Sequence, residues 1–241
     1  MSEQPYSRSA AVYDVVYAGD YPYGDAALSV HGFIQARKPG ARTVLEAACG
    51  TGLFAVEMSR WYEVAGLDAA PDMLSACRRR LPDMELHEGD MAHFNLGKTY
   101  DAVICMFSSI GYVVSVDRLR SALQGFAAHV SPGGIVVVEP WIYPEGWIDN
   151  HTSIDSWSNG DIDVARVISS DREGRKVTMR WGFTVARPGG DVEAYVENHP
   201  TGLFDHHEYL TAFSEAGLRV DHDPQGPIGR GLYVGVKPVV V

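Results

Sequence analysis

The stretch VLEAACGTG, Val44 to Gly52, decides the fold of this 241-residue chain. Its first two residues fit a strand that is buried on both faces of a parallel sheet, and a helix is expected from Leu53 to about Trp61. Two glycines, Gly50 and Gly52, leave room for a ligand to lie against the backbone. The helix N-terminus adds free N–H groups. The pattern predicts a ligand-binding turn between a strand and a helix.

A second strand end supports a nucleoside at this turn. An apolar segment that begins at Val64 ends on Asp68, an expected acceptor for ribose hydroxyls. Ala55 stands where the dinucleotide pattern requires a third glycine. Glu46 places an acid where a phosphate would be repelled. These residues favour S-adenosylmethionine, with S-adenosylhomocysteine as product, over a dinucleotide. Read alone, GTG fits equally well a turn that simply needs glycine.

Composition limits the remaining classes of protein. The net charge is −11, with 46% hydrophobic and 21% charged residues, as in ordinary globular proteins. No long uncharged apolar segment predicts a membrane span, and the polar stretch Met1–Arg8 lacks a signal-peptide core. The three cysteines are widely spaced and read as reduced thiols. We therefore expect a cytoplasmic protein that binds neither nucleic acid nor membrane.

Two segments differ in their hydrophobic pattern. Strand and helix signals alternate as far as Glu139, which predicts a mainly parallel sheet with helices on both faces. From about Trp141 to Pro200, alternating runs without a useful helix predict antiparallel strands. We expect an α/β domain of residues 1–140 and 201–241. Residues 141–200 then form an inserted antiparallel β layer that covers the pocket mouth.

Local signals predict two helix caps. Asp117 is expected to cap the helix that follows it, and Asp205 with Glu208 predicts a capping box.

The N-terminal region is rich in tyrosine. Val12 and Val16 lie four residues apart, which predicts a short amphipathic helix there. The stretch Tyr21–Gly24 resembles a loop, and Tyr23 on such a loop is expected to face a ligand.

Open α/β sheets bind ligands outside the carboxyl ends of their strands. Four strand ends here carry suitable groups: the glycine turn for the amino acid part, Asp68 for the ribose, Asp90 for the adenine amino group, and Met106 near the methyl. Met73 fits either the adenine or the ordinary core. The expected cofactor residues are Glu46, Ala48, Gly50, Gly52, Asp68, Ala69, Met73, Asp90, Met91 and Met106.

Methyl transfer from a sulfonium is an in-line displacement that needs an aligned, unprotonated nucleophile. Alignment alone supplies about 7–11 kcal/mol of such a barrier. The sequence shows no metal-ligand spacing, and His206 and His207 read as surface residues. No metal is therefore expected, and N-methylation of an amine that tyrosine hydroxyls orient is favoured.

Six motifs, spread almost end to end, carry a family resemblance. They are ACGTG (Ala48–Gly52), GDM (Gly89–Met91), MFSSIGY (Met106–Tyr112), VVVEPW (Val136–Trp141), LFDHHEY (Leu203–Tyr209) and GRGLYVG (Gly229–Gly235). The chain resembles the S-adenosylmethionine-dependent N,N-dimethyltransferases of nucleotide-linked amino sugars, of the desosamine and mycaminose type. The resemblance implies a Rossmann-like class I methyltransferase fold, with a seven-stranded, mostly parallel sheet. It also implies a dTDP-linked amino sugar of antibiotic biosynthesis as substrate, and a homodimer.

The resemblance also assigns substrate-side residues. It implies positioning roles for Tyr6, Tyr13 and Tyr112. It places the sugar or its diphosphate near Ser108, Ser109, Trp141 and Arg230, with Arg166 as a weaker candidate that an exposed strand arginine explains equally well. The chain departs from the family pattern at Asp20–Tyr23, Ile142–Tyr143 and His199–Gly202. These departures leave the sugar, its amino position and the nucleotide open.

Two other functions stay open at this point. One is methyl transfer to a different small acceptor, such as an amino acid or a natural-product aglycone. The other is a non-catalytic binding protein on the same scaffold.

Overall fold

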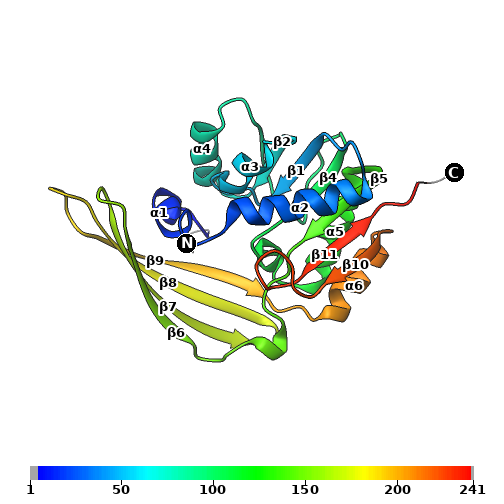
Figure 1. The fold of residues 1–241 in the computed structure, drawn as a ribbon. Helices are drawn as coiled ribbons and strands as arrows, with labels where there is room; N and C mark the ends of the chain where they lie inside the picture. Colours follow the sequence, from blue (N-terminus) through cyan, green and yellow to red (C-terminus); the bar gives the residue numbers. More distant parts are fainter. Residues whose placement is uncertain (1–4, 240–241) are drawn as a thin grey trace.

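The computed structural model describes residues 5–239 and contains a seven-stranded sheet and a four-stranded sheet (Figure 1). The first four residues of the polar stretch Met1–Arg8 therefore lie outside the described residues. The larger sheet has the order β10-β11-β5-β4-β1-β2-β3. Its strands are β1 (Thr43–Ala47), β2 (Glu63–Asp68), β3 (Glu85–Glu88), β4 (Tyr100–Cys105), β5 (Val130–Val138), β10 (Arg219–Asp223) and β11 (Leu232–Val236).

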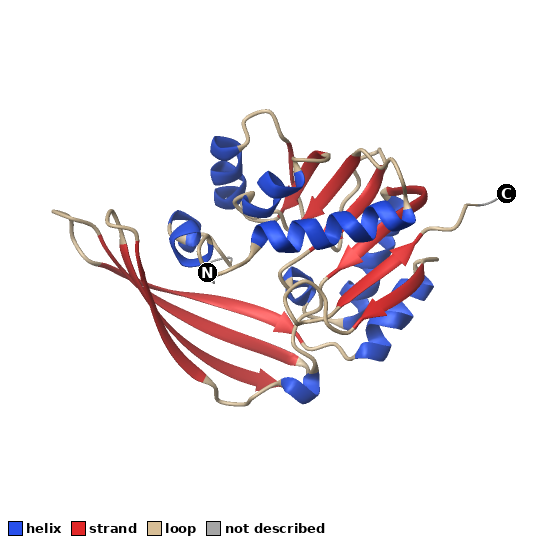
Figure 2. Ribbon diagram, in the orientation of Figure 1, coloured by secondary structure: helices blue, strands red, loops and turns tan. Residues whose placement is uncertain are grey.

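The larger sheet is mostly parallel, as expected. The strands from β5 to β3 pair in parallel, whereas β11 pairs antiparallel with β5 and with β10. Central strands are apolar on both faces because helices cover both (Figure 2). The helices are α1 (Tyr13–Tyr17), α2 (Tyr23–Arg37), α3 (Leu53–Met58), α4 (Pro71–Arg80), α5 (Val116–Ala128) and α6 (His206–Glu215).

Two cores lie on the two faces of this sheet. On one face, Val30 and Ile34 of α2 pack with Phe54 of α3 against β1, β4 and β5. On the other, Phe126 of α5 and Phe213 of α6 pack against the alternate residues of the same strands. The arrangement holds the carboxyl ends of β1, β2 and β4 in fixed positions relative to one another.

The smaller sheet is antiparallel and built from β6 (Thr152–Ser158), β7 (Asp163–Glu173), β8 (Lys176–Ala186) and β9 (Glu193–Gly202). Its strands alternate buried and exposed residues, so one face is covered. That face packs against α1 (Figure 1), and a third core contains Val12, just before α1, and Val16 together with Trp181 and Phe183. The division of the chain into residues 1–140 with 201–241, and 141–200, stays a prediction.

The capping box of Asp205 and Glu208 is confirmed. The Asp117 cap is wrong: α5 begins at Val116, and the Ser115 side chain accepts from the Arg118 N–H instead. Ser115 has the extended backbone that an N-cap requires, whereas Asp117 already lies in the first turn.

Two helix boundaries also differ from expectation. Tyr23 does not lie on a loop but begins α2, directly after Pro22. The helix expected to reach about Trp61 ends at Met58. Within residues 5–239, no helix combines the length and the apolar content that crossing a bilayer requires.

Candidate active site

The glycine turn after β1 contains two glycines with different tasks. Gly50 has a φ of +55°, and a Cβ built there meets nothing within 4 Å. Open space above Gly50 fits a ligand lying against the backbone. A Cβ at Gly52 would lie 2.7 Å from Cys77 Sγ of α4, so Gly52 is required by packing. Between them, the Thr51 hydroxyl donates to Asp14 Oδ1 at 2.7 Å, which ties α1 to the turn.

Two acids stand at the ends of neighbouring strands beside this turn. Glu46 is 3% exposed, and its Oε2 has no hydrogen-bond partner. Burial, with the nearby Cys77 and Asp68, holds the Glu46 pKa well above its usual value. Asp68 accepts from the Gly50 N–H at 2.8 Å and the Ala70 N–H at 2.9 Å. Burial raises the Asp68 pKa, although these backbone donors and Ala69 oppose the shift.

The other predicted cofactor residues lie on α4 and after β3 and β4. Met73 on α4 and Met106 after β4 are each 2% exposed. Asp90 forms an ion pair with Arg118 at 2.6 Å. Burial raises the Asp90 pKa, but hydrogen bonds from Arg118 and the Ala92 N–H outweigh it and lower the pKa overall. Met91 is half-buried and packs against the α5–α6 core.

The residues present fit S-adenosylmethionine. The unpartnered Glu46 oxygen suits a cation, and the space above Gly50 suits a ligand. Asp68 carries a carboxylate with spare lone pairs for hydroxyl groups. Ala48 has a φ of +59°, which costs about 1–3 kcal/mol for a non-glycine residue. Such strain is typical of a turn that surrounding structure holds in place for a ligand.

A strained turn also follows β4. Phe107 and Ser108 both have positive φ, at 52° and 62°. The Ser108 hydroxyl donates to the Pro140 carbonyl at 2.8 Å, and its oxygen accepts from Arg230 Nη1 at 3.0 Å. Ser109 begins η2 (Ser109–Val113) and is half-buried. Predicted residues from β4 and from the loop before β11 are thus in direct contact.

Glu139, at the end of β5, was not predicted as a site residue. It is fully buried, its Oε1 lies 3.2 Å from Ser108 Oγ, and its Oε2 has no partner. Burial raises its pKa to about 7, against the opposing effect of Arg230, which lies 4.0 Å away. The sequence held a signal, because Glu139 ends an otherwise uncharged strand inside VVVEPW.

Trp141 stands beside the same turn. A Cβ at Gly111 would lie 3.0 Å from the Trp141 ring, so η2 and the tryptophan are in close contact. The Arg230 guanidinium lies 6.0 Å from the Trp141 ring centroid. The Trp141 Nε1–H is buried without a partner, which leaves a donor for a ligand.

The predicted tyrosines form one continuous array. The Tyr6 and Tyr112 hydroxyls are 2.8 Å apart, and the Tyr13 ring contacts the Tyr6 ring at 5.7 Å. Burial raises the pKa of all three phenols, so they stay neutral. Ring contacts continue through Tyr17 and Tyr21 to Tyr23. Tyr23 in turn contacts Phe107 at 4.9 Å, which joins the tyrosines to the turn after β4.

Arg166 lies within this array and not on the surface. It is 8% exposed, donates to the Tyr17 hydroxyl at 2.7 Å, and sits 5.0 Å from the Trp181 ring. The exposed-arginine alternative is therefore wrong. Tyr17 and Tyr21 lie between the two arginines: Arg166 donates to the Tyr17 hydroxyl, the Tyr17 and Tyr21 rings are in contact, and Arg230 lies 6.0 Å from the Tyr21 ring centroid.

A second unpredicted acid holds the N-terminal segment. Glu197 on β9 accepts from the Arg8 N–H at 2.7 Å, the Ser9 N–H at 2.9 Å and the Ser9 hydroxyl at 2.6 Å. Burial raises its pKa, but these donors and His199 outweigh burial and lower it to about 2. The carboxylate therefore fixes the backbone that carries Tyr6.

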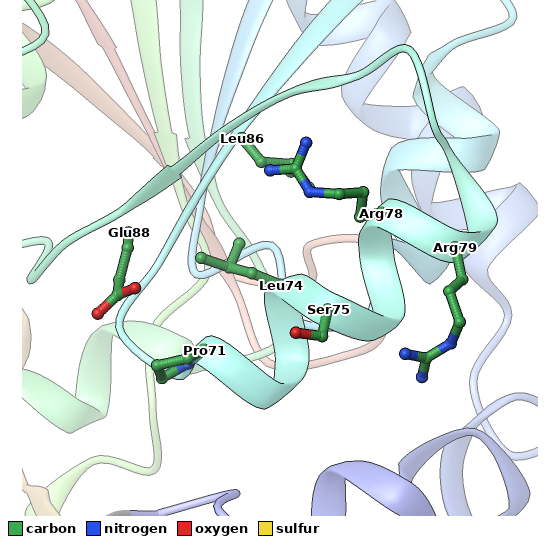
Figure 3. Close-up of a pocket in the computed structure, with 7 residues that line it drawn as sticks. All are labelled: Pro71, Leu74, Ser75, Arg78, Arg79, Leu86 and Glu88. Carbon is green, nitrogen blue, oxygen red and sulfur yellow. The ribbon is translucent and has the colours of Figure 1, made fainter.

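An open groove between α4 and β3 is separate from these residues (Figure 3). It contains none of the predicted site residues. Its lining residues are Pro71, Leu74, Ser75, Arg78, Arg79, Leu86 and Glu88.

Comparisons with known proteins identify the family. A family model described as a methyltransferase domain matches residues 44–134. A dTDP-3-amino-3,4,6-trideoxy-α-D-glucopyranose N,N-dimethyltransferase of Streptomyces venezuelae is 44% identical, over 94% of this chain and 97% of its own. A dTDP-3-amino-3,6-dideoxy-α-D-glucopyranose N,N-dimethyltransferase of Streptomyces fradiae is 40% identical, over 94% of this chain and 90% of its own.

Solved structures agree. The crystal structure of Streptomyces venezuelae DesVI matches with a TM-score of 0.89 at 43% identity, over 95% of this chain and 98% of that one. SAM-bound CalS10, an amino pentose methyltransferase from Micromonospora echinaspora, matches with a TM-score of 0.83 at 35% identity, over 98% of this chain and 100% of that one. The chain therefore belongs to the family of S-adenosylmethionine-dependent N,N-dimethyltransferases of dTDP-linked amino sugars.

Proposed function

We propose that this enzyme transfers methyl groups from S-adenosylmethionine to the amine of a dTDP-linked deoxy-amino sugar, one at a time, in antibiotic biosynthesis. The observation that carries the proposal is the 44% identity, over nearly the whole of both chains, to a relative named for this reaction. Three features of the site support it. Two acids lie at adjoining strand ends, the tyrosine array contacts Phe107 in the turn after β4, and the Arg230 guanidinium contacts Ser108 in the same turn.

When bound, S-adenosylmethionine supplies an electrophilic methyl group: the amine lone pair forms the C–N bond as the S–C bond breaks, and sulfur keeps the electron pair. Asp68 holds the ribose hydroxyls, and Glu46 attracts the cationic amino acid part. Met73 and Met106 offer apolar surface, while Asp90 and Met91 lie on the adenine side. Gly50 and Ala48 shape the turn, and Gly52 and Ala69 support its packing.

The substrate lies on the other side of the turn after β4. Arg230 contacts the diphosphate, because a guanidinium offers a planar fork of donors to phosphate oxygens. Ser108, Ser109 and Trp141 flank the sugar. Tyr6, Tyr13 and Tyr112 hold the amine in line with the methyl, and Tyr23 and Arg166 complete the wall of the pocket.

A sugar with its amine at carbon 3 is the preferred substrate. The two relatives at 44% and 40% identity are named for 3-amino sugars. A relative at 34% identity, from Saccharopolyspora spinosa, is named for a 4-amino sugar. A homodimer and a cytoplasmic location stay predictions, and analytical ultracentrifugation measures the first.

A competition assay tests this proposal. The enzyme is incubated with S-adenosylmethionine and an equimolar mixture of a dTDP-3-amino and a dTDP-4-amino deoxy sugar, and the products are resolved by mass spectrometry. We expect the 3-amino sugar to gain one and then two methyl groups first. Parallel incubations contain glycine or an aglycone hydroxyl as acceptor, and methylation of either one, with both sugars unchanged, would instead support the other-acceptor alternative.

A further inference from the structure

A buried glutamate and histidine lie directly behind the tyrosine array. Glu197 and His199 alternate along β9 on its covered face, and both are fully buried. The Trp181 ring stacks on the imidazole at 3.7 Å with an interplanar angle of 23°. The Tyr112 hydroxyl lies 2.9 Å from His199 Nδ1, whereas Glu197 lies near the other ring nitrogen, Nε2.

The two neighbours of the imidazole fix its tautomer. His199 Nε2 lies 3.4 Å from Glu197 Oε2 without forming a regular hydrogen bond. A proton on Nε2 is still favoured, because an Nε2 lone pair would face the negative charge of the carboxylate. Nδ1 is then an acceptor, and the Tyr112 hydroxyl must donate to it. The same logic holds in other sites where a carboxylate orients an imidazole. Glu197 therefore determines, through the tautomer of His199, that the Tyr112 hydroxyl donates to Nδ1.

Tyr112 presents an acceptor to the pocket as a result. Its own proton is engaged by His199, so the Tyr6 hydroxyl, 2.8 Å away, must donate to the Tyr112 oxygen. One lone pair of that oxygen remains free. Tyr112 keeps part of its surface exposed, whereas Glu197 and His199 do not. Only Tyr112 of these three residues can touch a substrate amine.

We propose that Tyr112, His199 and Glu197 form a proton-accepting array for the reacting amine. This inference rests on the proposed function. Tyr112 is the catalytic residue, and His199 and Glu197 are positioning residues that act through it. After the first transfer, the methylated nitrogen carries an extra proton and has no lone pair for a second attack. That proton passes to the Tyr112 oxygen as the Tyr112 proton passes to His199 Nδ1.

The charges balance in this step. An ammonium and a neutral imidazole become a neutral secondary amine and an imidazolium, and Glu197 stabilises the new positive charge. The imidazolium later returns its proton to solvent through the same hydroxyl. The second methyl transfer then starts from an unprotonated nitrogen.

The surroundings keep the His199 imidazole neutral, so that it can accept a proton. Burial lowers the His199 pKa, Glu197 opposes that shift, and the charge of Arg166 on β7 adds to it. From the other elements, His199 faces Tyr112 of η2, Tyr6 of the N-terminal segment and Trp181 of β8. Only Glu197 among these groups is an anion, so it alone favours the imidazolium.

Nuclear magnetic resonance of the protein with 15N-labelled histidine tests the tautomer without any turnover. The proton-accepting array requires a neutral His199 with its proton on Nε2. We therefore expect the Nδ1 resonance to shift in Tyr112→Phe, which removes the hydroxyl that donates to Nδ1. A proton found on Nδ1 would overturn the proposal. This reading does not depend on which substrate the enzyme uses.

Product-resolved kinetics test the proton transfer. His199→Phe keeps a ring against Trp181 but removes both nitrogens, and His207→Phe, at an exposed position of α6, is the matched control. We expect His199→Phe and Tyr112→Phe to slow formation of the dimethylated sugar about a hundredfold, so that the monomethylated sugar accumulates. We also expect the acid limb of the pH–rate profile for the second transfer to change in His199→Phe, because only protonation of the substrate amine then limits the rate at low pH.

Calorimetric binding of S-adenosylmethionine shows that each variant is folded. A folded His199→Phe that dimethylates at the wild-type rate, with the wild-type pH profile, would overturn the array. If the wild-type protein methylates no amino sugar at all, the proposed function fails, while the resonance experiment still decides the tautomer.

Discussion

The Gly50 N–H donates to Asp68 Oδ2 at 2.8 Å, which couples the glycine turn after β1 to the end of β2. This bond holds the two parts of the proposed cofactor site at a fixed distance, because Asp68 also accepts from the Ala70 N–H with its other oxygen. The carboxylate thus shapes the site before any ligand binds. In the proposed site, the hydroxyl groups of a ribose would meet an acceptor that is already oriented.

Replacing Asp68 by alanine should weaken binding of S-adenosylmethionine. A hydrogen bond to a charged acceptor contributes about 1.5–3 kcal/mol, which is about a tenfold to hundredfold change in Kd. Isothermal titration calorimetry measures it. Asp72→Ala, on the exposed first turn of α4, is the control and should bind as the wild type does. Equal Kd values for the two variants would refute the ribose role.

Replacing Arg230 by alanine should affect the sugar and not the cofactor. Removal of the guanidinium takes away the contact to Ser108 Oγ and the proposed contact to diphosphate. We expect KM for the dTDP-sugar to rise about tenfold or more, since charged hydrogen bonds contribute about 1.5–3 kcal/mol. Steady-state kinetics with Arg219→Ala as control check this. Loss of cofactor affinity alone in Arg230→Ala would contradict the site map.

Glu139 should make the stability of the protein depend on pH near neutrality. Its pKa is about 7 in the folded protein against 4.5 ordinarily, so the folded state favours the protonated form. The stabilisation is complete below about pH 4.5 and is lost as the pH rises through about 7. Over that interval we expect a loss of about 3 kcal/mol that Glu139→Gln does not show.

Urea denaturation of wild type and Glu139→Gln at both ends of that pH interval measures the difference. Glu63→Gln on the exposed start of β2 should follow the wild type. Parallel pH curves for the wild type and Glu139→Gln would mean that the Glu139 carboxyl titrates normally.

Glu197→Gln should release the N-terminal segment. The carboxylate accepts three hydrogen bonds from Arg8 and Ser9, and an amide cannot replace all of them. Hydrogen exchange of residues 8–16 should accelerate about tenfold to hundredfold, as expected for loss of about 1.5–3 kcal/mol. Glu193→Gln breaks only exposed pairs, those with Arg8 and Arg187, and should leave exchange unchanged. Equal exchange in both variants would show that Glu197 does not hold this segment.

The sequence predicts the larger sheet well, because parallel strands buried on both faces leave uninterrupted apolar runs such as those in β4 and β5. The glycine turn at Gly50 and the capping box at Asp205 were also predicted, because each depends on residues that are close in the sequence. The Asp117 cap failed because Ser115, two residues earlier, offers the same chemistry. The loop predicted at Tyr23 was wrong, because packing of α2 on the sheet, and not local propensity, sets where that helix begins.

The site residues that were missed depend on contacts between distant segments. His199 lies 87 residues from Tyr112 and Glu197 lies 188 residues from Ser9. Period-two alternation along β9 places Glu197 and His199 on one face, but nothing local indicates that a tyrosine hydroxyl meets that face. Glu139 was visible as an acid after an apolar strand, yet its burial follows from the turn after β4.

The most direct measurement is a time course with S-adenosylmethionine and a dTDP-3-amino deoxy sugar, read by mass spectrometry of the intact nucleotide sugar. We expect the sugar to become heavier by one methyl group and then by two, with an equivalent of S-adenosylhomocysteine for each. A protein that binds S-adenosylmethionine but leaves both 3-amino and 4-amino sugars unmethylated would contradict the account.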